Sequence, residues 1–285
     1  MDVVELKEKI INTLLNSSLV RSNLVISLGR MIRSLSKSNF VEIEGRKMFT
    51  HGNDGLALSI FKVYEPAQTK IVKQYVREGD VVIDIGAHVG YYTLLMAQLV
   101  GKKGKVFSFE PDPLNFQLLK KSVEINRFDN VILVQKAVSN TTEKIKLFVG
   151  NNDRAINRIY DAKLGDAKES IDVESIRIDE YFKENDELVN FIKIDSEGSE
   201  VKIINGMKQF LSRNQELVMM TEFFPFLIKK SGDEPNQYLK SLEKSGFSLY
   251  NILDKNEKTN KINSENFLES GINSQYCTNL LCIKQ

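Results

Sequence analysis

The chain has 285 residues, of which 42% are hydrophobic and 27% are charged, and its formal net charge is +1. This composition is typical of globular proteins, and the length allows one large domain or a core domain with an extension. A net charge this close to zero offers no basic surface for nucleic acid, so we expect no nucleic-acid partner. No stretch reaches the roughly 18 consecutive apolar residues that would predict a membrane span.

The chain has two cysteines, Cys277 and Cys282. Because their separation along the chain is odd, they would point to opposite faces of a strand. This spacing predicts neither a disulfide nor a metal site, and reduced thiols are typical of a cytoplasmic protein. Glu5, Lys7 and Glu8 stand where a signal peptide would need an apolar core. We therefore expect a cytoplasmic protein.

Residues 1–39 are predicted to form a helical extension ahead of a domain that spans residues 40–285. Leucine and isoleucine recur at helical spacing over residues 3–36, and the second half of this segment adds arginine and lysine. Such a helix could pack on the domain or on a partner. Its basic face also allows an alternative, peripheral contact with an anionic membrane.

Two short strands are predicted near residues 40–49 and 56–61, joined by a polar loop that contains His51. A histidine in such a loop is more typically solvated than catalytic. A helix should begin at Glu65-Pro66, because proline is favoured in the first turn, and run to about residue 76.

From residue 81 onward, strands and helices alternate, which indicates a parallel sheet with helices on both faces. Strands are predicted at 81–85, 105–109, 131–134, 189–194, 216–222, 247–252 and 276–283. Helices are predicted near 90–100, 112–126, 199–212 and 236–245. An insertion at 140–180 contains β-like segments at 144–149 and 171–178, and residues 254–270 are predicted to form a solvated loop.

The segment around Asp84 carries the strongest functional signal. A β-branched strand stops at Gly86, a helical pattern begins near Gly90, and Glu110 closes the next strand. This arrangement builds a nucleoside pocket at the carboxyl ends of parallel strands. A dinucleotide fingerprint would need glycine where His88 and Tyr91 stand, so a pyrophosphate ligand is excluded. The two carboxylate oxygens of Glu110 can each accept a ribose hydroxyl.

With Asp84, Gly86 and Gly90 in register, the turn resembles the first motif of S-adenosylmethionine-dependent methyltransferases. A second acidic segment follows the strand at 189–194, where Asp195 and Glu197 precede Gly198 and a helix start. These carboxylates should lie at the same rim of the sheet as Gly86, near a helix N-terminus that favours negative charge. The alternative is helix capping by Asp195 or Ser196, with Glu200 completing a capping box.

Together, these segments make the chain similar to the FkbM family of methyltransferases, over roughly residues 49–283. The motifs that carry the resemblance are Tyr64-Glu65-Pro66, Gly79-Asp80 with Asp84, Gly86 and Ala87, Phe109-Glu110-Pro111, Ala137-Val138-Ser139, and Asp195 with Glu197, Gly198 and Glu200. One departure is His88, where the family more often has Asn.

This resemblance implies an α/β, Rossmann-like class I methyltransferase fold. Its mostly parallel sheet has seven strands in the order 3-2-1-4-5-7-6, with helices on both faces. It also implies that S-adenosylmethionine is the cofactor and that the methyl acceptor is a hydroxyl of a sugar, glycan or small-molecule metabolite. The residues expected to bind the cofactor are Glu65, Asp84, Gly86, Ala87, His88, Gly90, Glu110, Ala137 and Asp195.

Asp195 and Glu197 are the expected catalytic residues, because a carboxylate whose pKa is raised by partial burial can take a proton from an alcohol. Asp84 could instead brace the turn, and Glu65 could be an exposed first-turn acid. His88 is expected to pack beside the ligand. Oxygen ligands at this rim could suit Mg²⁺, but acids near strand ends are common, so no metal is predicted.

Two alternatives remain open at the level of sequence. One is methylation of nitrogen in a small molecule, protein or RNA, although such sites often carry an Asn/Asp-Pro-Pro-aromatic run that this chain replaces with Asp-Ser-Glu-Gly. The other is a non-catalytic module that keeps the cofactor fold for partner contacts. Residues 223–226, Phe-Phe-Pro-Phe, could line the acceptor pocket or simply pack in the core.

Overall fold

The computed structural model describes residues 40–51, 58, 63–150, 154–184, 187–253, 258–268 and 276–284. The expected extension at 1–39, with its membrane hypothesis, lies outside these residues. The strand expected at 56–61 also lies outside them, except for Leu58, which is helical and buried. Among the described residues, no helix combines the length and the apolar character that crossing a membrane requires.

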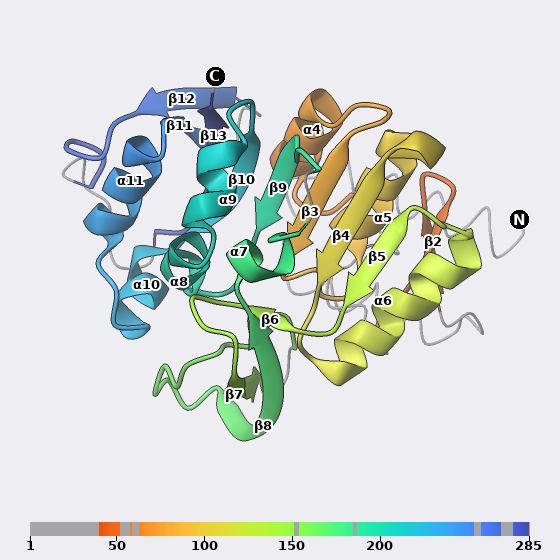
Figure 1. Cartoon of the computed structure of the whole chain (residues 1–285). Helices are drawn as coiled ribbons and strands as arrows, with labels where there is room; N and C mark the ends of the chain where they lie inside the picture. Colours follow the sequence, from red (N-terminus) through yellow and green to blue (C-terminus); the bar gives the residue numbers. More distant parts are fainter. Residues whose placement is uncertain are drawn as a thin grey trace, which may run out of the picture.

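The centre of the molecule is an eight-stranded sheet in the order β12-β11-β13-β10-β9-β3-β4-β5 (Figure 1). Its strands are β3 (Val81–Ile85), β4 (Lys105–Phe109), β5 (Val131–Val134), β9 (Phe191–Ile194), β10 (Val218–Phe223), β11 (Phe247–Leu253), β12 (Lys258–Ile262) and β13 (Thr278–Lys284). The strands β5, β4, β3, β9 and β10 are parallel, and β13, β11 and β12 are added antiparallel.

Seven of these strands follow the expected order, but the expected count of seven is wrong. Strand β12, which pairs with β11, lies in the segment predicted to be a solvated loop. Four of its five residues are exposed, because it forms the edge of the sheet. The polar composition that predicted a loop there belongs to an edge strand, which is protected from further pairing by its lysines.

Helices cover both faces of the sheet, as expected. They are α4 (Pro66–Tyr75), α5 (Tyr91–Val100), α6 (Pro113–Asn126), α7 (Ile178–Tyr181), α8 (Glu200–Asn205), α9 (Lys208–Arg213), α10 (Pro225–Lys230) and α11 (Pro235–Lys244), with a 3₁₀ turn η1 (Gly101–Lys103) after α5. Alternate strand residues serve the two layers: Val82 packs with α4, α5 and α6, whereas Ile83 packs with α8, α9 and α11.

The helix expected at 199–212 is interrupted, and α8 and α9 are separate. At Gly206 a Cβ atom would lie 2.1 Å from the carbonyl oxygen of Ser139, so only glycine permits this approach. The carbonyl oxygen of Gly206 also accepts a hydrogen bond from the amide of Asp179 at 3.0 Å. The break between α8 and α9 therefore packs against the backbone of Ser139 and accepts a hydrogen bond from the first turn of α7.

At the start of the described chain, the strand expected at 40–49 is a hairpin of β1 (Phe40–Ile43) and β2 (Arg46–Phe49). Glu44 and Gly45 both have positive φ angles, 49° and 80°, which the tightest hairpin turns require. The amide of Phe49 donates to Ser122 Oγ at 2.9 Å, so the hairpin is fixed against α6.

A small second sheet comes from the insertion. Its strands are β6 (Ala137–Val138), β7 (Lys144–Gly150) and β8 (Ala167–Ile176), in the order β6-β8-β7, and a short 3₁₀ turn, η2 (Arg154–Ile156), lies between β7 and β8. This sheet stands beyond the carboxyl ends of the parallel strands (Figure 1). The insertion therefore closes the side of the main sheet on which ligands bind in open α/β folds.

Candidate active site

A cavity lies at the carboxyl ends of β3, β4 and β9, under the insertion. It is lined by the turn at 86–88, by Glu110, by β6, by Arg154, Ala155 and Asn157 of the insertion, and by residues 195–197. Of the nine residues expected to bind the cofactor, Gly86, Ala87, His88, Glu110, Ala137 and Asp195 line it. Both residues expected to be catalytic, Asp195 and Glu197, line it as well.

The turn after β3 depends on Gly86. Its φ angle is +78°, and a Cβ atom there would lie 1.8 Å from the carbonyl oxygen of Asp195. The amides of Gly86 and Ala87 both donate to the carbonyl oxygen of Phe109 at 3.0 Å. This glycine therefore lets three strand ends, those of β3, β4 and β9, meet without side chains between them.

Two further residues of the turn have positive φ angles. Gly90, at φ +102°, begins α5, and a Cβ atom there would meet Leu119 Cδ1 at 2.6 Å. His88 has a φ angle of +51° and lines the cavity, and its amide donates to Glu110. Asn and His are both enriched in this backbone region, which explains how His88 fits where the resembling family more often has Asn.

Glu110 is buried, with 4% of its surface exposed, and its carboxylate is fixed by backbone amides. Its Oε2 accepts from the amide of His88 at 2.8 Å, and its Oε1 accepts from the amide of Asp112 at 2.9 Å. Burial raises the pKa of Glu110 to about 7, although these two amides oppose the shift. Asn115 Nδ2 lies 3.5 Å from Oε1 as a second, longer contact, whereas Oε2 keeps a further lone pair that can accept a hydroxyl.

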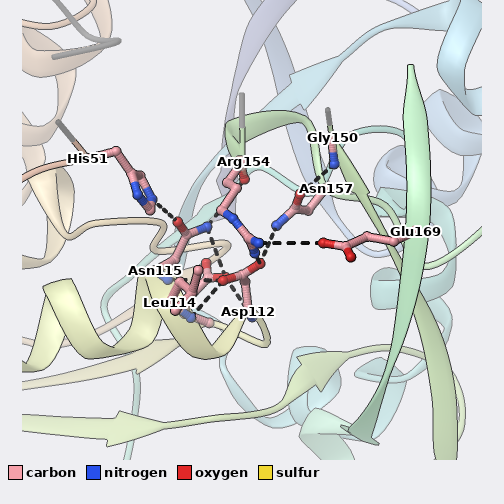
Figure 2. A network of polar contacts seen from close by, with 9 residues as sticks. His51, Asp112, Leu114, Asn115, Gly150, Arg154, Asn157 and Glu169 are labelled. Atoms are coloured by element: carbon pink, nitrogen blue, oxygen red, sulfur yellow. Dashed lines mark hydrogen bonds and ion pairs between the residues drawn. The ribbon is translucent and has the colours of Figure 1, made fainter. Parts of the chain in front are cut away.

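A polar network joins α6 to the insertion beside Glu110 (Figure 2). Asp112 Oδ1 caps α6 by accepting from the amides of Leu114 and Asn115 at 2.8 and 3.0 Å. Asp112 Oδ2 accepts from the guanidinium of Arg154 and, at 2.9 Å, from Asn157 Nδ2. These contacts hold η2 over the cavity.

The same network includes His51. Its Nε2 lies 2.6 Å from Oδ1 of Asn115, whose Nδ2 donates to the carbonyl oxygen of Arg154 at 3.2 Å. His51 is therefore partly exposed, as expected for a loop histidine, and is also hydrogen-bonded to this network. Asn115, Arg154 and Asn157 line the cavity and were not identified from the sequence, because a capping acid and an insertion give no ligand-binding pattern until they meet in space.

Asp84 does not line the cavity, unlike the direct cofactor contact that was expected. It is fully buried, and its Oδ2 accepts from Thr93 Oγ1 at 2.6 Å. Burial raises the pKa of Asp84, and the ammonium of Lys193, 3.9 Å away, opposes this shift. Asp84 thus braces β3 against α5, which is the alternative that the sequence left open.

Glu65 also lies outside the residues that line the cavity. It precedes α4 with a φ angle of +44°, and its Oε2 accepts from the hydroxyl of Tyr92 at 2.8 Å. Tyr92 itself lines the cavity. Glu65 therefore adjoins the cavity wall through this tyrosine, and its direct contact with the cofactor stays a prediction.

Three carboxylates, here called the acidic rim, gather at the ends of β9 and β10. One oxygen from each of Asp195, Glu197 and Glu222 lies within 4.8 Å of the others. Burial, followed by the charges of Asp195 and Glu197, raises the pKa of Glu222 well above its ordinary value. Oxygens at this spacing could share a hard cation or accept hydroxyl protons. Glu222 was not predicted, because it is one acid at the end of an otherwise apolar strand.

Glu200 serves the loop between β9 and α8. It is buried, and its Oε1 accepts from the amides of Ser196 and Gly198 at 3.0 and 3.3 Å. Burial raises the pKa of Glu200 to about 7. Ser199, at the N-cap of α8, makes no side-chain capping bond. Of the expected capping box, the structure shows the bond from Glu200 back to the amide of Ser196.

The aromatic run after β10 packs rather than lining the cavity. Phe223 is fully buried and stacks on Tyr238 with ring centroids 6.3 Å apart. The rings of Phe224 and Phe226 contact one another at 5.9 Å. Core packing is therefore the interpretation of residues 223–226 that the geometry favours.

Comparison with known proteins gives two matches to family models. The model described as Methyltransferase FkbM domain matches residues 84–249, more than half of the chain. A model for protein-L-isoaspartate(D-aspartate) O-methyltransferase matches residues 6–138. The first match includes Asp84, Glu110, Asp195 and Glu222, so it spans both the turn and the acidic rim.

Individual relatives are more distant. A Sulfurisphaera tokodaii protein named for cobalt-precorrin-6B C(15)-methyltransferase (decarboxylating) is 32% identical over 82 residues, which is 27% of this chain and 43% of that protein. The chain spans less than half the length of the curated relatives it matches.

Among solved structures, an FkbM methyltransferase from Methylobacillus flagellatus is 13% identical, with a TM-score of 0.45, and the match covers 75% of this chain and 50% of that one. An rRNA methylase from Streptococcus thermophilus is 12% identical, with a TM-score of 0.42, over 76% of this chain and 93% of that one.

The match to the methyltransferase family model, together with the fold, the turn after β3 and the buried acid after β4, identifies the chain as an S-adenosylmethionine-dependent methyltransferase. Within that class, the chain belongs to the FkbM family.

Proposed function

We propose that this enzyme transfers the methyl group of S-adenosylmethionine to a hydroxyl oxygen of a sugar, a glycan or another small-molecule metabolite. The observation that carries the proposal is the juxtaposition of the cofactor turn with the acidic rim. Gly86 lies against the backbone of Asp195, and the carboxylates of Asp195, Glu197 and Glu222 meet beside it. An alcohol needs such a proton acceptor, because its hydroxyl is a weak nucleophile.

In this proposal the cofactor is held by the residues that line the cavity around the turn. Gly86, Ala87 and His88 would face it, and Gly90 would begin the helix behind the turn. Glu110 would accept the ribose hydroxyls with the lone pairs that its amide contacts leave open, and Ala137 would contact the nucleoside from β6. Asp195 would complete the site from β9.

The cofactor supplies a methyl group on a positively charged sulfur, which departs as a neutral thioether. The protein then has two tasks. It must hold the hydroxyl oxygen in line with the methyl carbon, and it must take the hydroxyl proton. We assign the second task to Asp195 or Glu197, whose carboxylates lie at the cavity. The oxygen gains the methyl carbon, and the proton moves to the carboxylate.

We also propose that the methyltransferase domain spans residues 40–285. In support, the β1–β2 hairpin packs on α6 through Phe49 and Ser122, so it is part of the domain. Residues 1–39 would then be a separate N-terminal extension.

The cofactor arm of the proposal is tested by calorimetry with S-adenosylhomocysteine. Binding is expected, and a purified protein that binds neither this product nor S-adenosylmethionine would overturn the proposal. The acceptor arm uses a metabolite and glycan extract incubated with cofactor labelled in its methyl group. A labelled O-methyl product found by mass spectrometry would support it, and label found only on nitrogen would contradict it.

A further inference from the structure

Lys193 is a buried cation that the proposed reaction does not use. It lies in β9 and is 5% exposed, yet its side chain lines the cavity. Its register partner in β3 is Asp84. Side chains two residues apart in a strand share a face, so Lys193 stands on the same face as Asp195 and directly beside Asp84.

The ammonium group of Lys193 contacts three parts of the site. Its Nζ lies 3.2 Å from Oδ2 of Asp195 and 3.9 Å from Oδ1 of Asp84. It also donates to the carbonyl oxygen of Gly86 at 3.3 Å. One side chain therefore connects the strand before the cofactor turn, the turn itself and the acidic rim.

The charges around Lys193 explain why it can be buried. Burial alone lowers the pKa of this lysine, but the carboxylates of Asp195 and Asp84 outweigh it and raise the pKa above its usual value. The ring of Tyr92 lies 5.1 Å from Nζ and adds a favourable cation–π contact. Without the ammonium, Asp84 and Asp195 would face one another with no cation between them.

We propose that Lys193 is a positioning residue that fixes the cofactor turn through Gly86 and balances the negative charge of Asp84 and Asp195. The inference rests on the proposed function, since it assumes that the sulfonium group binds beside this rim. Its consequence concerns charge during the reaction. Methyl transfer turns a cationic cofactor into a neutral product, so a strongly anionic site would stabilise the starting state and oppose transfer.

The test compares two ligands that differ in charge at one atom. S-adenosylmethionine carries the sulfonium charge and S-adenosylhomocysteine does not, so the ratio of their dissociation constants reports the field at the sulfur. In Lys193→Met the ratio should move at least about fivefold in favour of S-adenosylmethionine, because an unbalanced carboxylate remains. Lys193→Arg, which keeps the charge, should return the ratio toward that of the wild type even if both affinities fall.

Asp195→Asn provides the reciprocal variant, and it also serves if Lys193→Met does not fold. It leaves the ammonium in place and removes a carboxylate, so the ratio should move toward S-adenosylhomocysteine. The control is Lys208→Met, at an exposed position in α9, which should leave the ratio unchanged.

Equal losses of affinity for both ligands in Lys193→Met, with the ratio unchanged, would show a purely structural role and overturn the inference. If Lys193→Met does not fold, an unchanged ratio in Asp195→Asn would overturn it instead. These outcomes are distinguishable from failure of the proposed function, in which the wild-type protein would bind neither ligand.

Discussion

The two ends of the cavity treat negative charge in opposite ways. At the Glu110 end, each oxygen of Glu110 accepts a backbone amide, and Asp112 accepts two amides and two side-chain donors. At the Asp195 end, three carboxylates crowd within 4.8 Å, and Lys193 pairs with one of them. At the Glu110 end the carboxylates are held mainly by fixed hydrogen-bond donors. At the Asp195 end they lie beside other ionisable groups that influence their charge.

This difference fits two different tasks. Fixed amides hold a ligand in one orientation, because they need no rearrangement when it binds. Carboxylates that share a small volume are sensitive to any charge or proton that enters, which suits a group that must accept a proton. The contrast predicts that changes at the Glu110 end alter affinity, and that changes at the Asp195 end alter charge preference and turnover.

The turn that joins the two ends should be the most sensitive position. In Gly86→Ala the new Cβ would lie 1.8 Å from the carbonyl oxygen of Asp195, in a backbone region that alanine disfavours. We expect a loss of about 4 kcal/mol or more in the free energy of unfolding, since the clash is with backbone. Urea denaturation followed by circular dichroism measures it.

The matched control for that change is Gly79→Ala. Gly79 also has a positive φ angle, +90°, but beyond its neighbours in the chain no atom lies within 4 Å of the place that a Cβ would occupy. Only the backbone cost of about 1–2 kcal/mol should remain. Equal losses in the two variants would show that the meeting of β3 and β9 at Gly86 does not matter.

The next largest effect concerns the fixed end of the cavity. Glu110→Ala should weaken binding of S-adenosylhomocysteine by about 1.5–3 kcal/mol, the range for hydrogen bonds to a charged group. Calorimetry measures the loss, and Glu124→Ala, at an exposed position of α6, should bind as the wild type does. Unchanged affinity in Glu110→Ala would remove this carboxylate from the proposed ribose site.

Most of the fold could be predicted from the sequence, and so could the principal residues at each end of the cavity. The periodicity predicted the parallel strands, their helices and the insertion, because each has a local pattern. Strand β12 was missed, since an exposed edge strand has the composition of a loop. The turn and Glu110 were predictable because their spacing is short along the chain. The sequence placed Lys193 in a strand but did not predict its contacts with Asp84, Asp195 and Gly86.

The residues that the sequence could not supply come from pairs distant along the chain. Arg154 meets Asp112 from the insertion, and Glu222 meets Asp195 from the next strand. Neither pair has a local signature, because their roles depend on the order of strands and the path of the insertion. Asp84 shows the opposite case: it belongs to the cofactor motif, yet its carboxylate accepts from Thr93 of α5 and it does not line the cavity.

A pH dependence should separate the two ends. The pKa of Glu110 is about 7 because of burial, well above the ordinary value for glutamate. Ribose hydroxyls bind the carboxylate form, so affinity for S-adenosylhomocysteine should rise with pH up to about 7 and then level off. Below that pH, binding should release a proton and weaken by up to about tenfold per pH unit.

Calorimetry from pH 5.5 to 8.5, in buffers of different ionisation enthalpy, gives both the affinity and the protons released. Glu110→Gln should make the affinity flat with pH. Glu200→Gln is the control, because the pKa of Glu200 is also about 7 yet Glu200 lies outside the cavity lining. If the affinity lost its pH dependence in Glu200→Gln but kept it in Glu110→Gln, the titrating group would be Glu200, and the proposed role of Glu110 would be contradicted.

The smallest expected effect tests how firmly the insertion closes the Glu110 end. Arg154 is partly exposed and pairs with buried Asp112, which keeps Asn157 and two amides as partners when the guanidinium is lost. Arg154→Ala should therefore cost at most about 1 kcal/mol in stability. Its affinity for S-adenosylhomocysteine should fall by a few fold, since Arg154 also lines the cavity. Lys146→Ala, which breaks the exposed pair with Asp172 on the same insertion, should change neither quantity. A similar loss of affinity in both variants would mean that the insertion acts through its overall folding, and that the contact between Arg154 and Asp112 does not itself shape the site.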